Sequence, residues 1–123
     1  MQHNKIPSKE DLGMFKKAYS AARRRANKKK LIFNITLDDM ISQYYGQNGK
    51  CFYSNISMNI TKKRKHVLHD PYKMTIDRRV QSLGYIKENI VWCLYCINSL
   101  KQNMLEKEVL EICRAVVSND KKN

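Results

Sequence analysis

MTIDRRVQSLGYIKENIVWCLYCINSLKQNM, residues 74–104, is the stretch of the sequence that decides the fold. Residues 73–78 (KMTIDR) have the composition of a β-strand, residues 81–89 hold the only glycine of this half and predict a turn, and residues 90–93 (IVWC) predict an antiparallel partner strand. From Tyr95 onward the apolar residues recur at helical spacing. The stretch therefore predicts a strand, a turn, a second strand and a helix.

The residues before this stretch predict two further helices. Ser8 has the form of an N-cap and opens a predicted helix over residues 9–27. A short run of β-formers, residues 31–35 (LIFNI), follows it. Thr36 then opens the second predicted helix, which ends at Gly46.

Two other segments have simple interpretations. Residues 60–72 (ITKKRKHVLHDPY) are polar and basic and end in Asp-Pro, which predicts a surface loop able to follow a nucleic-acid backbone. Residues 109–117 carry apolar side chains at helical spacing, which predicts an amphipathic helix packed into the core.

Length and composition predict one mostly helical α+β domain. With 123 residues, 42% of them hydrophobic, 4 Gly and 2 Pro, the chain can bury one core. We divide it into an N-terminal helical part (1–50), a central hairpin and helix core (51–103), and a C-terminal helix and tail (104–123).

The charge of the chain predicts a polyanionic partner. There are 24 Lys and Arg against 11 Asp and Glu, a formal net charge of +13, and nucleic acid is the partner that such an excess favours. A membrane partner is not expected, because the longest apolar run, residues 90–97, is too short to span a bilayer. The N-terminus lacks the apolar region of a signal peptide, so we expect an intracellular protein.

A basic run ends the first predicted helix. It is either a solvated face or a phosphate-binding surface, and the overall charge favours phosphate. Its candidate nucleic-acid-binding residues are Arg23, Arg24, Arg25, Lys28, Lys29 and Lys30.

Asp77 and Asn98 are the candidate metal ligands. The first lies at the end of the first predicted strand and the second in the first turn of the following helix, so both can face one groove. A carboxylate and an amide oxygen are hard ligands that suit a single Mg²⁺ or Mn²⁺ ion, whose remaining ligands are waters and a substrate phosphate.

The ordered set of Asp77-Arg78, Gly84-Tyr85, Asn89 and Asn98-x-x-Lys101 resembles the HNH (ββα-metal) endonuclease motif in its small phage or viral form. The resemblance extends upstream, through IFNITLDDM at residues 32–40 and a Cys-x-Tyr-Ser segment at residues 51–54.

The resemblance implies a ββα-metal core within residues 51–103 and metal-dependent cleavage of DNA. It also implies roles for single residues: Asp77 and Asn98 as ligands of a divalent ion, Asn89 as the residue that ties the loop between the strands, and Lys101 facing a phosphate. Arg79, beside the Asp-Arg pair, is a further candidate contact to nucleic acid.

The sequence departs from the HNH pattern at one position. Most members of the family have a histidine, the general base, directly after the metal-binding Asp, whereas this chain has Arg78. A guanidinium stays protonated and cannot accept a proton from water, although it can stabilise negative charge. His66 and His69 are the candidate replacements, with a metal-bound hydroxide as the alternative.

Three cysteines are candidate zinc ligands. Cys93 and Cys96 have the spacing of a zinc knuckle, but the partner knuckle is incomplete, because Ser54 follows three residues after Cys51. Buried free thiols are the alternative interpretation of these residues.

Three functions remain open on sequence alone. The first is a metal-dependent endonuclease, with DNA preferred over RNA as the substrate. The second is a nucleic-acid-binding or structural protein that keeps the scaffold but has lost or weakened cleavage. The third is a component of a viral or ribosome-like assembly in which the charge serves RNA packing.

Overall fold

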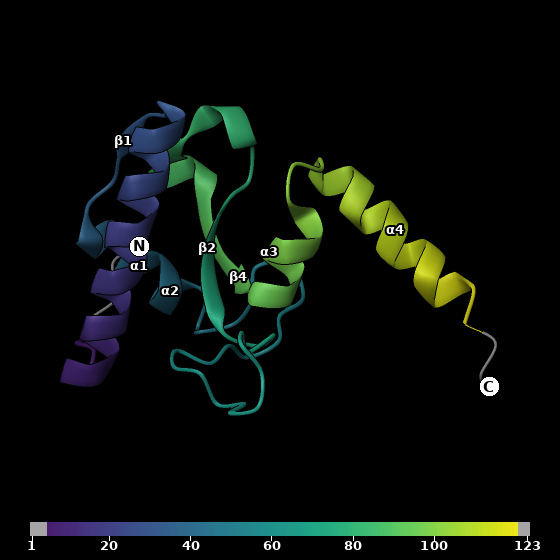
Figure 1. The fold of residues 1–123 in the computed structure, drawn as a ribbon, viewed down its shortest axis with the longest axis horizontal. Coiled ribbons are helices and arrows are strands. Elements are labelled where there is room, and N and C mark those ends of the chain that lie inside the picture. Colours follow the sequence, from purple (N-terminus) through teal and green to yellow (C-terminus); the bar gives the residue numbers. More distant parts are fainter. Residues whose placement is uncertain (1–4, 121–123) are drawn as a thin grey trace.

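The hairpin and helix predicted from residues 74–104 are present in the computed structural model of the protein, which describes residues 5–120. Strand β2 (Met74–Arg78) pairs antiparallel with β4 (Ile90–Leu94). Helix α3 (Tyr95–Lys101) follows β4 directly and packs against both strands. Figure 1 shows this unit in the centre of the molecule.

The other elements surround this unit. Over the described residues, the chain is a single α+β domain with four helices and two small sheets, as composition predicted. The remaining helices and strands are α1 (Lys9–Lys29), β1 (Phe33–Asn34), α2 (Leu37–Gly46), β3 (Tyr85–Ile86) and α4 (Glu106–Ser118), with short 3₁₀ turns at Gln81–Leu83 and Lys87–Asn89.

The helix starts follow from local capping. Ser8 Oγ accepts a hydrogen bond from the Asp11 backbone N–H at 3.1 Å, which opens α1. Thr36 and Asp39 form a reciprocal capping box at the start of α2. Helix α1 continues two residues beyond the predicted end and stops at Lys30, whose φ of 56° is left-handed.

The segment predicted as a turn between the strands contains a strand of its own. Strand β3 pairs parallel with β1, which lies far earlier in the sequence. Gly84, with φ 72°, makes this pairing possible, because a Cβ there would lie 2.6 Å from the Ile32 carbonyl oxygen. Local sequence predicted the turn but did not identify its distant partner.

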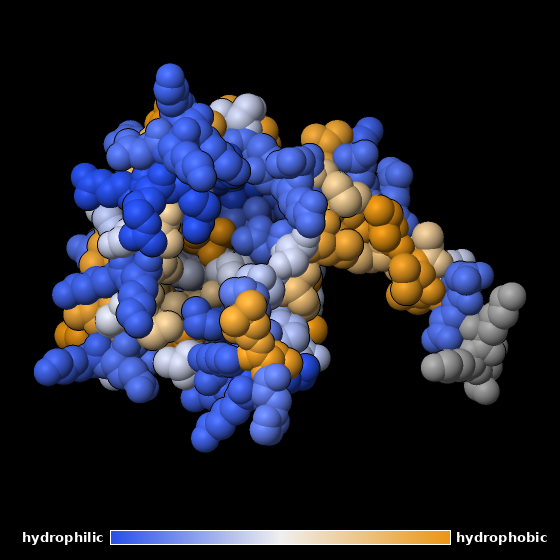
Figure 2. Space-filling view, viewed as in Figure 1, coloured by the Kyte–Doolittle hydropathy of each residue, from blue (hydrophilic) through white to orange (hydrophobic). Residues whose placement is uncertain are grey.

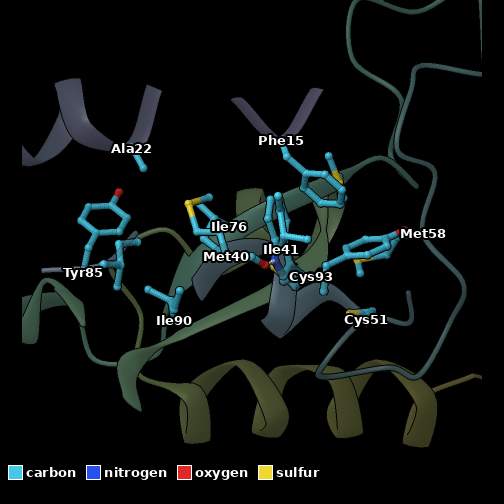
Figure 3. Close-up of a cluster of buried hydrophobic side chains, with 14 of the residues drawn as sticks. Phe15, Ala22, Met40, Ile41, Cys51, Met58, Ile76, Tyr85, Ile90 and Cys93 are labelled. Carbon is cyan, nitrogen blue, oxygen red and sulfur yellow. Dashed lines mark hydrogen bonds between the residues drawn. The ribbon is translucent and has the colours of Figure 1, made fainter. Parts of the chain in front are cut away.

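The core lies between α1, α2 and the β2–β4 pair. Trp92 is fully buried at its centre, and its indole N–H donates to the Met40 carbonyl at 2.8 Å. The rings of Phe15 and Tyr44 pack edge-on against Trp92, with centroids 5.7 and 5.8 Å away. Figure 3 shows Phe15 and Ala22 pointing from α1 into this cluster.

Helix α4 differs from its prediction. It was expected to pack into the core, yet Val109 is its only buried residue, and residues 110–120 are all exposed. Figure 1 shows α4 extending away from the body, and Figure 2 shows hydrophobic residues along it. The prediction was wrong because an amphipathic pattern indicates an apolar face without indicating what covers it.

None of the helices in the described range 5–120 is both long enough and apolar enough to cross a bilayer.

Candidate functional site

An open cleft lies between α1, β2 and α3. Its volume is about 580 Å³, and Figure 2 shows a hollow in this part of the surface with hydrophilic side chains along its rim. The candidate ligands Asp77 and Asn98 both line it, so the structure brings together the two residues that the sequence paired. The other charged and polar residues of the lining are Arg25, Lys29, Lys73, Thr75, Arg78, Gln81, Tyr85, Tyr95, Ser99, Gln102 and Asn103.

Asp77 is buried and held by two donors. Only 3% of the residue is exposed, and its Oδ2 atom accepts from the Tyr53 hydroxyl at 2.6 Å and from Lys101 Nζ at 2.9 Å. Both hydrogen bonds end on the same oxygen. Within the described part of the chain, Oδ1 of Asp77 therefore has no hydrogen-bond partner, although the residue lines the cleft.

Lys101 differs from its expected role. Its side chain is 1% exposed, and it does not line the cleft. Besides Asp77, its ammonium donates to the carbonyls of Arg78 at 2.8 Å and Arg79 at 3.1 Å. An ammonium has three donors, and all three are used inside the protein. In this structure Lys101 balances the charge of Asp77 instead of facing a phosphate.

Tyr53 belongs to the site but was not predicted to act there. Burial, together with the hydrogen bond and negative charge of Asp77, raises the pKa of the Tyr53 phenol well above its ordinary value. The phenol therefore stays protonated and keeps donating. The Cys-x-Tyr-Ser segment at residues 51–54 was the available signal, but it did not indicate that the ring would reach β2.

Asn98 leaves its amide oxygen available. Its Nδ2 atom makes two long hydrogen bonds, to Thr75 Oγ1 at 3.3 Å and to the Ile76 carbonyl at 3.4 Å. No described residue donates to its Oδ1 atom. Asp77 Oδ1 and Asn98 Oδ1 are thus two hard oxygen atoms, on residues that line one cleft, to which no described residue donates, and such oxygens are the ligand type that Mg²⁺ and Mn²⁺ prefer.

Four basic residues line the same cleft as Asp77 and Asn98. Arg25 and Lys29 from α1, Lys73 at the start of β2, and Arg78 at its end all line the cleft. Because the charge of Asp77 is already matched by Lys101, the cleft has a strong positive excess, which favours a phosphate backbone.

Lys73 and Arg78 are held in different ways. Burial, and then the nearby charge of Lys17, lowers the pKa of Lys73. Arg78 donates to the Gln81 carbonyl at 2.7 Å and lies over the Tyr85 ring. Lys73 was missed by sequence analysis, yet it lies four residues before Asp77, and strand alternation places the two on the same side of β2.

The other predicted cations divide into three groups. Arg24 lies with Lys16 and Lys17 in a neighbouring depression on α1. Arg79 makes a two-pronged ion pair with Glu106, at 2.9 and 3.0 Å, so its charge is used within the protein. Arg23, Lys28 and Lys30 are exposed and do not line the cleft.

Neither candidate histidine lines the cleft. His69 stacks on the ring of Tyr95, with centroids 4.7 Å apart, so it contacts a residue of the lining without lining the cleft itself. His66 lies in the loop after residue 60 and is exposed. The cleft as described therefore presents Arg78, and no imidazole, where the HNH pattern has its general base.

Asn89 has the tying role that the resemblance implied. It is 2% exposed, its amide nitrogen donates to the carbonyls of Val80 at 2.9 Å and Gly84 at 2.8 Å, and its oxygen accepts from the Val80 N–H at 2.9 Å. These bonds close the loop between β2 and β4. Asn89 acts on the loop and does not line the cleft.

The cysteines do not gather into a ligand set. Cys51 and Cys93 are buried and Cys96 is exposed, and burial raises the pKa of the Cys93 thiol to about 12. Across residues 5–120, no group of three or more His, Cys, Asp or Glu residues is placed to hold a metal ion. The zinc site stays a prediction without support from this arrangement.

Comparison with known proteins adds no family to this description. No protein-family model, curated protein or solved structure matches the chain.

Proposed function

We propose that this protein is a metal-dependent phosphodiesterase of the HNH type that cleaves nucleic acid, with DNA as the preferred substrate. One observation carries the proposal: a single cleft holds Asp77 and Asn98 together with four cationic side chains. A carboxylate and an amide suit a divalent ion, and the cations suit the backbone that such an ion would act on.

The metal would bind through Asp77 Oδ1 and Asn98 Oδ1, two oxygens to which none of the residues 5–120 donates a hydrogen bond. When bound, the ion supplies polarisation of the scissile phosphate and stabilisation of the leaving oxygen. Lys101 and Tyr53 hold the other oxygen of Asp77, which fixes the orientation of the carboxylate.

The cations orient the substrate. Arg25, Lys29 and Lys73 attract the backbone and set its position in the cleft. Arg78, held by the Gln81 carbonyl and the Tyr85 ring, keeps further N–H groups for a phosphate that gains negative charge during cleavage. It cannot act as the base, so the attacking water loses its proton to another group.

The test is a cleavage assay on supercoiled plasmid and branched DNA with Mg²⁺, Mn²⁺ or EDTA. We expect nicking that requires metal. It should fall at least a hundred-fold in Asp77→Asn and in Asn98→Ala, because each variant lacks one of the two protein ligands that hold the ion. Asp38→Asn is the control, since Asp38 is a carboxylate on an exposed position of α2 that does not line the cleft. Cleavage that survives in Asp77→Asn contradicts the proposal.

The substrate-binding part is tested separately. Lys29→Ala removes a cleft lysine, whereas Lys28→Ala removes its exposed neighbour on the same helix, which does not line the cleft. We expect weaker DNA binding and a smaller salt dependence for Lys29→Ala, with little change for Lys28→Ala. Equal effects of the two would indicate diffuse binding over α1.

A second candidate is a nucleic-acid-binding protein that does not cleave. It is favoured by two specific features: Asp77 is already neutralised by Lys101, and among residues 5–120 no histidine lines the cleft. This function predicts tight, salt-sensitive DNA binding that is the same in EDTA and in Mg²⁺, and no nicking with any metal.

A further inference from the structure

Helix α4 carries an apolar face that the described part of the chain leaves uncovered. Ile112, Val116 and Val117 are 42%, 67% and 74% exposed. The helix is fixed at its start, where Glu106 binds Arg79 and Tyr53, and its later turns project from the body. A run of exposed aliphatic residues of this extent is typical of an interaction surface.

The same helix also borders an apolar depression. A hollow of about 250 Å³ lies between α3 and the first half of α4. Its apolar lining is formed by Ile97, Leu100, Val109, Leu110 and Cys113. Helix α4 therefore presents a groove along its first half and a protruding ridge, Val116 and Val117, along its second half.

A groove and a ridge on one face are self-complementary under a two-fold axis. If a second α4 lies antiparallel, with the axis near Cys113, the ridge of each helix enters the groove of the other. An interface of this kind uses the same patch on both chains, as closed dimers do. Antiparallel helices also align their dipoles favourably.

The charge of α4 also favours a second copy of the chain as its partner. The chain as a whole has a net charge of +13, so most pairs of faces on two copies repel each other. Helix α4 is an exception because it is close to neutral: Glu106 is paired with Arg79, and Glu108 and Glu111 are matched by Lys107 and Arg114. Two copies can approach through α4 without bringing two basic surfaces together.

We propose that the exposed face of α4, with the groove beside α3, is the interface of a homodimer in which the α4 helices pack antiparallel. A helix of 13 residues is about 20 Å long. The interface therefore lies at the low end of specific interfaces, below about 1,200 Å² in total, and we expect a reversible dimer. This inference does not depend on the proposed cleavage activity.

The first test is the mass of the full chain by sedimentation equilibrium, across a wide range of concentrations up to the solubility limit. We expect a shift from the 14.5 kDa of one chain toward twice that mass. Val116→Glu should weaken association at least ten-fold. Leu68→Glu is the matched control, because Leu68 is an aliphatic residue of the loop 60–72 that is 84% exposed and does not line the groove beside α4.

The second test fixes the orientation. In Cys96→Ser protein, Cys113 is the exposed cysteine that remains among the described residues. We expect a short bis-maleimide to join two chains through Cys113, and the product to disappear with Val116→Glu. Circular dichroism of each variant confirms that the monomer is folded.

Two results overturn the proposal. One is a chain that stays at 14.5 kDa at every concentration, which would mean that α4 does not bind a second copy. The other is a dimer that Val116→Glu leaves unchanged, which would place the interface elsewhere. Asp77→Asn tests only the proposed cleavage activity. We expect this variant to dimerise like the unchanged protein whether or not it cleaves DNA.

Discussion

Asp70 and Asp77 are both buried and lie seven residues apart, but different groups donate hydrogen bonds to their carboxylates. Asp70 uses both oxygens: Oδ2 accepts from Asn59 Nδ2 and the backbone N–H groups of Lys63 and Arg64, and Oδ1 accepts from the Tyr72 N–H. Asp77 accepts from a phenol and an ammonium, both on Oδ2.

The difference separates a structural carboxylate from one that can act on a ligand. Backbone donors around Asp70 organise the loop of residues 60–72 and leave none of its oxygens free. Lys101 and Tyr53 both hold one oxygen of Asp77, a residue that lines the cleft, and no described residue donates to its second oxygen. Burial alone does not distinguish the two residues. What distinguishes them is which groups donate and which of the two carboxylate oxygens accepts.

The largest effect is expected from Lys101→Met. This substitution removes the cation that balances Asp77, and breaking a buried ion pair costs about 3–5 kcal/mol of the free energy of unfolding. Urea denaturation measures the loss. The double variant Lys101→Met with Asp77→Asn should recover part of it, because no unpaired charge is left. A double variant no more stable than Lys101→Met would contradict the charge-balance interpretation.

Tyr53→Phe should have the next largest effect. It deletes a hydroxyl that donates to Asp77 at 2.6 Å and, at a longer distance of 3.3 Å, to Glu106. Loss of the short hydrogen bond to the charged Asp77 carboxylate corresponds to about 1.5–3 kcal/mol of the free energy of unfolding. Tyr95→Phe is the control, since the described residues give the Tyr95 hydroxyl no hydrogen bond. Equal losses of stability in the two variants would show that the Tyr53 hydroxyl contributes nothing specific to Asp77.

Asp70→Asn should act locally. An amide nitrogen in place of one oxygen faces N–H donors, so the loop of residues 60–72 loses part of its hydrogen bonding. We expect faster amide hydrogen exchange at Lys63 and Tyr72, with a smaller change in global unfolding than for Lys101→Met. Asp38→Asn, on an exposed position of α2, is the control. A global loss as large as that of Lys101→Met would remove the distinction between the two aspartates.

The smallest effect is the acid sensitivity of this loop. Hydrogen bonds from the Lys63 and Tyr72 N–H groups lower the pKa of Asp70 from 3.8 to about 2. A lowered pKa in the folded state stabilises the loop above pH 4, and this contribution is lost as the pH falls toward 2. The protection of the Lys63 amide, which is the slowing of its exchange relative to that of an unstructured peptide at the same pH, should fall between pH 5 and about pH 2. If the protection of the Lys63 amide depends on pH in the same way in Asp70→Asn, the role given to the Asp70 carboxylate is contradicted.

Local signals in the sequence determined much of this protein. The N-caps at Ser8 and Thr36 set the starts of α1 and α2, and the strand, strand and helix order followed from hydrophobic pattern. Placing Asp77 and Asn98 on one groove also followed, because a helix directly after a hairpin packs back on its strands. Each of these depends on residues close together in the chain.

Tertiary structure decided the rest, because it depends on which distant surfaces meet. The parallel pairing of β3 with β1 joins segments some fifty residues apart, and the burial of Lys101 required a strand, a helix and Tyr53 to converge. The basic run on α1 was also decided by tertiary structure. Its cations point to several sides of the helix, and only the packing of α1 against β2 places Arg25 and Lys29 in the cleft. Charge and amphipathic pattern specify that a surface is polar or apolar, and the partner of that surface is set by the folded chain as a whole.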